Sequence, residues 1–529
     1  MAMPVLLLFL KSGSGTDYNP KPVRLQAGGF ISKRLGIAEC DLLCFRSGSI
    51  REISRARSGE MVEGGKNDFR VMVVECGEYD PARIRAIVER GMKELGYEPK
   101  GKIALKPNVV FAYDPKLYSP IAYTNYDVVE GTVRAIADQA GVERISIIEN
   151  PAIGNPSRLT FRWSGYRERT ARLKPEISKP LSLVGIDEDR RVPVFIGGSV
   201  HHRVRLSKKF MEADSKIYVP KLKCHCVSKM TGTVKLNIGI LNFDDRSVRH
   251  DFLLDEKIAD LAQVGWPDFV VMDAIDIGVG NEALPPGRRL GLILMGKNAL
   301  AVDLVASRLL GLKGESEVPY LAALIKRGYE PSRLGEVSLL GDAKSVSDLE
   351  RFAERVKPYD DEFYRWQDCN KEFARMGSPL KLLHGPYSEF TNEKCETGCV
   401  MGIKMYMAFL EAFAGAEAFR KARPSLFIIG NIKEEVDAKG APVFMFGSCA
   451  KARIKNAKYV MKIEKCFVTA ADMILLVGNR TGIKSPFMDP RFLAMMVPAV
   501  LAGAVKKTIN GRYLQDVGDF VVQHLFRKL

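Results

Sequence analysis

The sequence predicts an α/β protein with a mostly parallel sheet flanked by helices, followed by a second, smaller α/β domain at the C-terminus. In residues 67–345, apolar runs alternate with amphipathic segments long enough for helices, which is typical of strand–helix–strand units. Apolar runs that end in glycine return in residues 395–529. A chain of 529 residues, 46% of them hydrophobic, has enough apolar material for more than one core.

The first predicted strands and helices follow one another up to residue 150. Both predicted helices end at a glycine, and the second strand stops at Pro107, which cannot continue a strand ladder. Ligands bind outside the carboxyl ends of parallel strands, so Lys106, Asn108 and Glu149 are candidate site residues by position. The predicted strands are 69–77, 102–108 and 144–150, and the predicted helices are 81–96 and 125–141.

A cationic stretch at residues 219–239 lies between two apolar segments and carries four lysines, one histidine and a Thr-Gly pair. Ammonium groups suit a phosphate or a carboxylate, so we expect a small anionic substrate here. In this interpretation Lys223 and Lys235 neutralise the anion and His225 is a general acid or base. The alternative is a solvated basic loop with one satisfied histidine. The further candidate substrate-binding residues are Lys221, Thr231, Gly232 and Asn237.

Two carboxylates beyond this stretch are also candidate substrate-binding residues. Asp273 lies where a predicted strand runs into a Gly/Pro-rich loop. Asp303 lies on the apolar stripe of a helix predicted at residues 298–311. Because a buried carboxylate needs a partner, we expect a lysine of the cationic stretch beside Asp303.

Four cysteines are predicted to converge in the C-terminal domain. Three apolar runs, each followed by glycine, predict parallel strands whose ends share one edge of a sheet. Cys449 lies at one of these ends, Cys466 ends a further predicted strand, and Cys395 and Cys399 precede a helix. The three runs are 426–431, 443–450 and 474–480.

Four converging cysteines suit a [4Fe–4S] cluster first and a structural zinc ion second. Free buried or redox-active thiols are the alternative to any metal, because the spacing matches no standard ferredoxin or zinc-ribbon pattern. Cys224 and Cys226 flank His225 and give a weaker metal signal, since on an extended chain both thiols face away from the imidazole.

Four motifs follow one another along the first domain. They are KPN (106–108), VPKLKCH with TGTVKLN (219–237), VVMDAIDIGVGN (270–281) and GKNALAVDLVASRLLG (296–311). Together they resemble the domain of unknown function 362 family over residues 69–345. The sequence departs from the family pattern at Leu236, which separates Lys235 from Asn237. The family positions that the resemblance implies are Lys106, Asn108, Lys223, His225, Thr231, Gly232, Lys235 and Asp303.

The resemblance implies a family whose members are often iron–sulfur-associated proteins of anaerobes and archaea. It does not imply a particular reaction. A more distant similarity to lactate-racemase-like nickel enzymes rests on lysine and histidine in a glycine-containing loop. The first hypothesis is therefore an anaerobic-type oxidoreductase with an anion site and a cysteine redox centre, served by an electron-transfer protein. The alternatives are a non-redox racemase, lyase or transferase on a small carboxylate or phosphate, and a basic nucleic-acid-binding protein.

The composition of the chain indicates which partners and which cellular compartment to expect. The formal net charge of +16 is spread thinly, without an arginine-rich tract, so small anions are favoured over nucleic acid. Ten cysteines in 529 residues are too few for a disulfide scaffold. Without a convincing signal peptide or an apolar run of about 18 residues, we expect a cytoplasmic protein with no membrane partner.

The predicted domain organisation has four parts. Residues 1–66 are Gly/Ser-rich and aperiodic, which predicts a disordered or over-extended N-terminal segment. Residues 67–345 form the family domain, with an arginine-rich insertion at 151–200. A linker at 346–394 leads to the cysteine-containing domain at 395–529.

Overall fold

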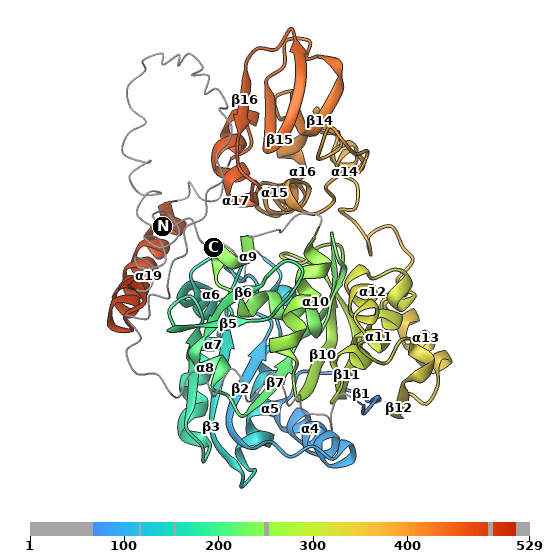
Figure 1. Ribbon diagram of the computed structural model, residues 1–529, viewed down its shortest axis with the longest axis vertical. Coiled ribbons are helices and arrows are strands. Elements are labelled where there is room, and N and C mark those ends of the chain that lie inside the picture. The colour runs from blue at the N-terminus through green and yellow to red at the C-terminus, as the bar shows by residue number, and fades with distance from the viewer. Residues whose placement is uncertain (1–66, 116–117, 153–154, 248–252, 485–489, 515–529) are drawn as a thin grey trace, which may run out of the picture. The chain divides into compact units, whose positions relative to one another are not determined.

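The computed structural model describes residues 67–115, 118–152, 155–247, 253–484 and 490–514 (Figure 1). The prediction for residues 1–66 therefore lies outside the described residues.

A ten-stranded sheet forms the centre of the first part of the chain, in the order β12-β1-β11-β10-β7-β2-β3-β4, with β8 pairing β10 and β9 pairing β8. Its strands pair mostly in parallel, but β11 runs antiparallel to both β1 and β10. The predicted fold class is confirmed. The bounds are β1 Arg70–Glu75, β2 Gly101–Pro107, β3 Val142–Glu149, β4 Leu181–Gly185, β7 Ser215–Val219, β8 Lys221–His225, β9 Lys229–Thr231, β10 Phe269–Gly278, β11 Gly287–Gly296 and β12 Ser338–Gly341.

Helices cover both faces of this sheet, as β1 shows by its alternation. Val71 and Val73 pack into one core with helices α10 to α13, whereas Met72 and Val74 pack into the other with α4 and α5. Successive side chains of a strand point to opposite faces, so a strand buried on both sides reads as one apolar run. The bounds are α4 Pro81–Leu95, α5 Tyr126–Ala137, α10 Leu254–Gly265, α11 Ala299–Leu309, α12 Pro319–Lys326 and α13 Val346–Ala353.

The predicted insertion at 151–200 contributes to the sheet itself. Its strand β4 pairs in parallel with β3, and helices α6 (Ser157–Trp163) and α7 (Tyr166–Leu173) precede it. A separate hairpin follows, made of β5 (Arg191–Phe195) and β6 (Arg203–Ser207), with α8 (Lys208–Met211) after it.

A second, four-stranded parallel sheet has the order β13-β14-β15-β16. Its first strand lies inside the range predicted as a linker. Helix α15 (Gly398–Ala414) begins at the predicted cysteine pair and packs in the core of this sheet. The bounds of the strands are β13 Leu380–His384, β14 Ser425–Asp437, β15 Val443–Lys455 and β16 Val460–Ile463.

The strand predicted at residues 474–480 is wrong. Residues 474–478 form a π-helix between α17 (Ala470–Met473) and α18 (Asn479–Thr481). The hydroxyl of Thr469 accepts from the backbone N–H of Asp472, whose carboxylate in turn accepts from Thr469, and this reciprocal cap starts the helix. Five apolar residues in a row fit a buried helix as well as a strand.

Candidate functional site

The cationic stretch forms a buried hairpin. Strand β8 pairs antiparallel with β9 and in parallel with β10, and a 3-10 helix, η3 (Val234–Ile240), follows. We call residues 221–237 the lysine–histidine loop. Lys221 and Lys223 are each 1% exposed and His225 is 4% exposed, so the alternative of a solvated loop is wrong.

Two of the predicted cations are held by carboxylates. The Nζ of Lys106 lies 2.7 Å from Glu149, and both side chains are buried. The Nζ of Lys221 lies 2.9 Å from Asp273 and donates to the hydroxyl of Tyr79 at 3.0 Å. Buried charges of this kind are stable when paired and hydrogen-bonded, so these pairs fix the sheet edge beside the loop.

Lys223 and Lys235 differ from that pair, because neither forms an ion pair within the described residues. The Nζ of Lys223 donates to the backbone carbonyls of Ala122 and Glu282, each at 2.6 Å. Burial lowers the pKa of Lys223 to about 7 and that of the half-buried Lys235 to about 8, although the nearby Glu282 opposes both shifts. Near neutral pH each amine is therefore able to give or take a proton.

His225 faces the carboxylate of Glu282, with Nε2 3.6 Å from Oε1. Its Nδ1 accepts from the backbone N–H groups of Val227 (3.1 Å) and Ser228 (3.2 Å). An acceptor at Nδ1 places the proton of the neutral ring on Nε2. The ring therefore presents an N–H toward Glu282 and the space beside it.

His225, Cys226 and Glu282 also form a set of metal-ligand types, with their ligand atoms within 4.8 Å of one another. A metal-bound histidine normally donates its second ring N–H to an acceptor. Here Nδ1 accepts instead, so a metal at Nε2 would require an imidazolate. Burial also raises the pKa of Cys226 well above its usual range, which disfavours the thiolate that a metal needs. These three residues therefore fit acid–base chemistry better than a metal site.

Asp303 anchors the loop through its backbone. Its carboxylate accepts from the N–H groups of Thr233 (2.5 Å) and Val234 (3.0 Å) and from the hydroxyl of Tyr320 (3.2 Å). Gly232 is required here, because a Cβ would lie 2.4 Å from the Asp303 carboxylate. The lysine predicted as the partner of Asp303 is therefore wrong, and backbone amides take that place.

Several buried polar atoms around the loop have no hydrogen-bond partner among the described residues: Ser228 Oγ, Thr231 Oγ1, Asn237 Nδ2 and Asp255 Oδ1. Most buried polar atoms in folded proteins are paired. Asp255 lies close enough to Lys235 for each to shift the pKa of the other. Unpaired buried polar groups that lie close together are typical of a site that binds a polar ligand.

The remaining predicted residues have structural contacts. Asn108 accepts from the N–H of Val110 through its side chain. Asn237 accepts from the hydroxyl of Tyr218 at 2.6 Å, which leaves its Nδ2 unpaired. Sequence reasoning missed Glu282, Asp255 and Tyr79, whose roles depend on neighbours far away along the chain.

The four C-terminal cysteines lie near one another. A Cβ at Gly447 would be 3.2 Å from the sulfur of Cys399 and 3.4 Å from that of Cys449. Burial raises the pKa of Cys399 to about 12, and Cys395, Cys449 and Cys466 are close enough to raise it further. No three of these sulfurs in the described chain lie within 4.8 Å of one another. A tetrahedral zinc would hold its sulfurs about 3.8 Å apart, whereas a cubane cluster spreads them, because each binds a different iron.

Helix α15 connects the cysteines with the lysine–histidine loop. Lys404 lies on this helix after Cys399, and its Nζ donates to the backbone carbonyl of Cys226 at 2.9 Å. Cys226 and Cys399 also belong to one apolar cluster. The two sets of candidate residues are therefore joined by packing, and not by sequence alone.

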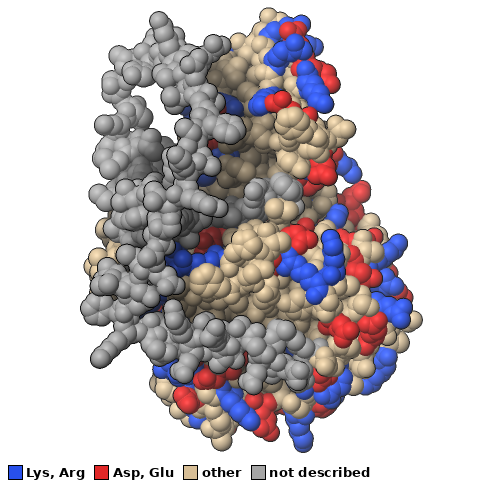
Figure 2. All heavy atoms as spheres, in the orientation of Figure 1, with Lys and Arg blue, Asp and Glu red and all other residues tan. Residues whose placement is uncertain are grey.

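Two further features of the described chain are its surface charge and the hydrophobicity of its helices. On the face in Figure 2, the described basic side chains are interspersed with acidic ones. Among the described residues, none of the helices is both long and apolar enough to span a bilayer.

Comparisons with known proteins show what parts of the chain are similar to. Residues 103–308 match a family described as "Domain of unknown function (DUF362)". The thylakoid-associated protein sll1697 of Synechocystis sp. is 24% identical over 275 residues, which cover 50% of this chain and 80% of that protein. A lactate racemase apoprotein from Thermoanaerobacterium thermosaccharolyticum superposes with a TM-score of 0.30 and 10% identity, over 48% of this chain and 58% of that one. The matched residues 103–308 contain the lysine–histidine loop, so this part of the chain is similar to the domain of unknown function 362 family.

Proposed function

We propose that the protein is an enzyme that binds a small carboxylate or phosphate at the lysine–histidine loop and exchanges electrons through a centre at the C-terminal cysteines. The observation that carries the anion site is the contrast between paired and unpaired lysines. Lys106 and Lys221 have carboxylate partners, whereas Lys223 and Lys235 form no ion pair within the described residues. A bound anion would supply the missing counter-charge.

In this proposal Lys223 and Lys235, when protonated, neutralise the charge of the anion. His225 donates or accepts the proton at Nε2, with Glu282 orienting the ring. The unpaired hydroxyls of Ser228 and Thr231 are available to hydrogen-bond the ligand. Asp303 keeps the loop in register by binding its backbone.

The proposed redox centre is a [4Fe–4S] cluster held by Cys395, Cys399, Cys449 and Cys466. Support comes from the nearness of the four thiols and from a spacing wider than one zinc ion would set. Such a cluster, when bound, transfers single electrons. The contact of Lys404 with Cys226 supports a role for α15 in linking this centre to the loop.

A non-redox reaction on the same anion is the second candidate. It is favoured by one observation: Lys223 and Lys235, with pKa values near 7 and 8, provide acid–base groups beside His225 without any redox partner. A racemase or lyase that moves a proton next to a carboxylate needs such groups.

Anaerobic purification with iron, sulfide, zinc and nickel analysis distinguishes the two candidates. The redox proposal expects about four irons per chain and a broad charge-transfer absorbance, both lost in a Cys399→Ser, Cys449→Ser double variant. Cys76→Ser is the matched control, because Cys76 is a buried thiol directly after β1 and away from the second sheet. A colourless protein without iron would remove the redox half and leave the acid–base candidate.

A further inference from the structure

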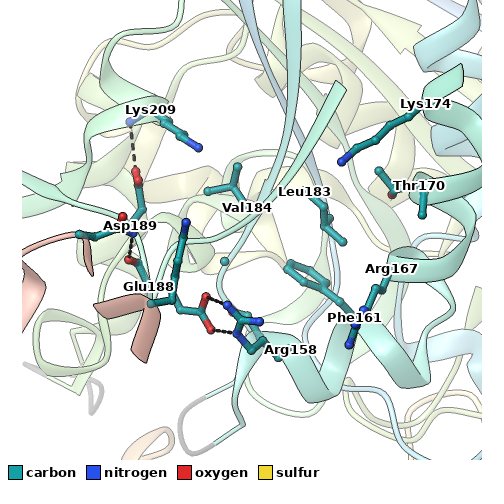
Figure 3. Close-up of a pocket in the computed structure, with 15 residues that line it drawn as sticks. Arg158, Phe161, Arg167, Thr170, Lys174, Leu183, Val184, Glu188, Asp189 and Lys209 are labelled. Carbon is teal, nitrogen blue, oxygen red and sulfur yellow. Dashed lines mark hydrogen bonds and ion pairs between the residues drawn. The ribbon is translucent and has the colours of Figure 1, made fainter. Parts of the chain in front are cut away.

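We propose that a second site, apart from the lysine–histidine loop, binds a small phosphate-bearing anion in the pocket between α6, α7, β4 and α19 (Pro490–Ile509). This pocket has a volume of about 420 Å³ (Figure 3). That size is within the usual range for small-molecule sites. The pocket lies at the predicted insertion, which the proposed function does not use.

Both acidic side chains of the pocket already have hydrogen-bond partners, and Glu188 is ion-paired with Arg158. Glu188 accepts two hydrogen bonds from Arg158, at 2.6 and 3.0 Å. Asp189 accepts from the hydroxyl of Ser207 at 2.6 Å and from the backbone N–H of Lys209 at 3.2 Å. The lining still carries an excess of positive charge, because five cations, Arg158 among them, face only these two carboxylates.

Four further cations line the pocket and form no ion pair within the described chain: Arg167, Lys174, Lys209 and Lys506. In Figure 3 the amine ends of Lys174 and Lys209 point toward the middle of the pocket from opposite walls. Like charges that converge on one cavity repel one another. A ligand with two or more negative charges would relieve that repulsion, and a phosphate group accepts from several donors at once.

The wall and the closing helix suit a small molecule. Phe161, Leu183 and Val184 supply an apolar wall. Helix α19 closes one side, because Asn510 donates to the backbone carbonyl of Glu188 at 2.7 Å. At Gly503 a Cβ would lie 3.2 Å from the Glu188 carboxylate, so the helix approaches closely. Single-stranded nucleic acid needs a long basic groove with stacking aromatic rings, whereas here the cations converge on one cavity.

Isothermal titration of the full chain with inorganic pyrophosphate tests the proposal. We expect a pyrophosphate site that is retained in Lys235→Met and whose affinity falls at least about tenfold in the charge-reversal variant Lys174→Glu, Lys209→Glu, since two charge-assisted contacts are lost. Both lysines are exposed, so the fold should survive, which circular dichroism would check. Lys381→Glu, an exposed lysine on β13, should leave the affinity unchanged.

Four outcomes would overturn the proposal. The first is no pyrophosphate binding by the wild type, and the second is equal affinity in the charge-reversal variant. The third is a loss in Lys235→Met with none in the charge-reversal variant, which would assign the binding to the lysine–histidine loop. An oligouridylate that binds more tightly than pyrophosphate, with affinity that rises with its length, would make the pocket part of a nucleic-acid surface instead.

Discussion

The Nε2 of His225 lies 3.6 Å from a carboxylate oxygen of Glu282, and the same glutamate accepts from the backbone N–H of Cys226. The two side chains come from β8 and from the segment after β10, which meet because these strands pair. The carboxylate of Glu282 is a negative charge near Lys223 and Lys235, whose pKa values are lowered by burial. The pKa values of these two lysines therefore depend on Glu282, and its substitution should shift them in a definite direction.

Glu282→Gln should lower the pKa of Lys235 below about 8, because the carboxylate favours the charged ammonium and its loss leaves burial unopposed. The pH dependence of acetylation at Lys235, followed by peptide mass spectrometry, measures this pKa. Asp276→Asn is the control, since that carboxylate is paired with Arg289. An unchanged pKa in Glu282→Gln would contradict the electrostatic account.

Stability should rise with pH above neutrality because of Lys223. Burial lowers its pKa from 10.5 to about 7, so between these values the unfolded chain holds a proton that the folded protein has released. The free-energy cost of burying Lys223 is therefore greatest below pH 7, and it disappears as the pH rises from about 7 to 10.5. Lys223→Met should reduce the slope of unfolding free energy with pH by about 1.4 kcal/mol per unit.

Urea unfolding at several pH values between about 7 and 10 measures that slope. The exposed Lys381→Met supplies the control, for which we expect the wild-type slope. Equal slopes in Lys223→Met and the wild type would mean that the ammonium is not held in a buried environment.

Gly447→Ala should impair the cysteine centre. Its φ of +100° costs a non-glycine residue about 1–2 kcal/mol, and the added Cβ would crowd the sulfurs of Cys399 and Cys449. Gly440→Ala meets the same backbone cost at φ +80° but has open space around its Cβ. Iron content should fall in the first variant and stay at the wild-type level in the second. Equal iron contents would argue against metal binding at these thiols.

Asp303→Asn should loosen the lysine–histidine loop. The amide can accept through one oxygen, but its NH₂ would face a backbone N–H of Thr233 or Val234, and one lost buried hydrogen bond costs about 1–3 kcal/mol. Hydrogen exchange at these two amides should therefore accelerate roughly tenfold or more. Ser307→Ala, on the same helix, removes a hydroxyl that bonds within the helix and should leave both amides protected.

The C-terminal region shows where sequence reasoning failed and why. Residues 443–450 are a strand within β15, as the apolar run predicts, but the similar run at 474–480 is helical. In both segments four apolar residues are followed by glycine, so periodicity cannot show which one is a strand and which one is a helix. The difference lies just upstream, where Thr469 and Asp472 cap a helix.

The sequence by itself determined the alternation of strands and helices, the position of the lysines and the set of cysteines, because these follow from local periodicity and composition. Only the tertiary structure decided which lysines are paired. Lys106 meets Glu149 across 43 residues and Lys221 meets Asp273 across 52, whereas Lys223 and Lys235 meet no carboxylate in an ion pair among the described residues. The charge state of a buried amine depends on neighbours that the fold supplies, and so only the structure separates the lysines that have a carboxylate partner from those that have none within the described chain.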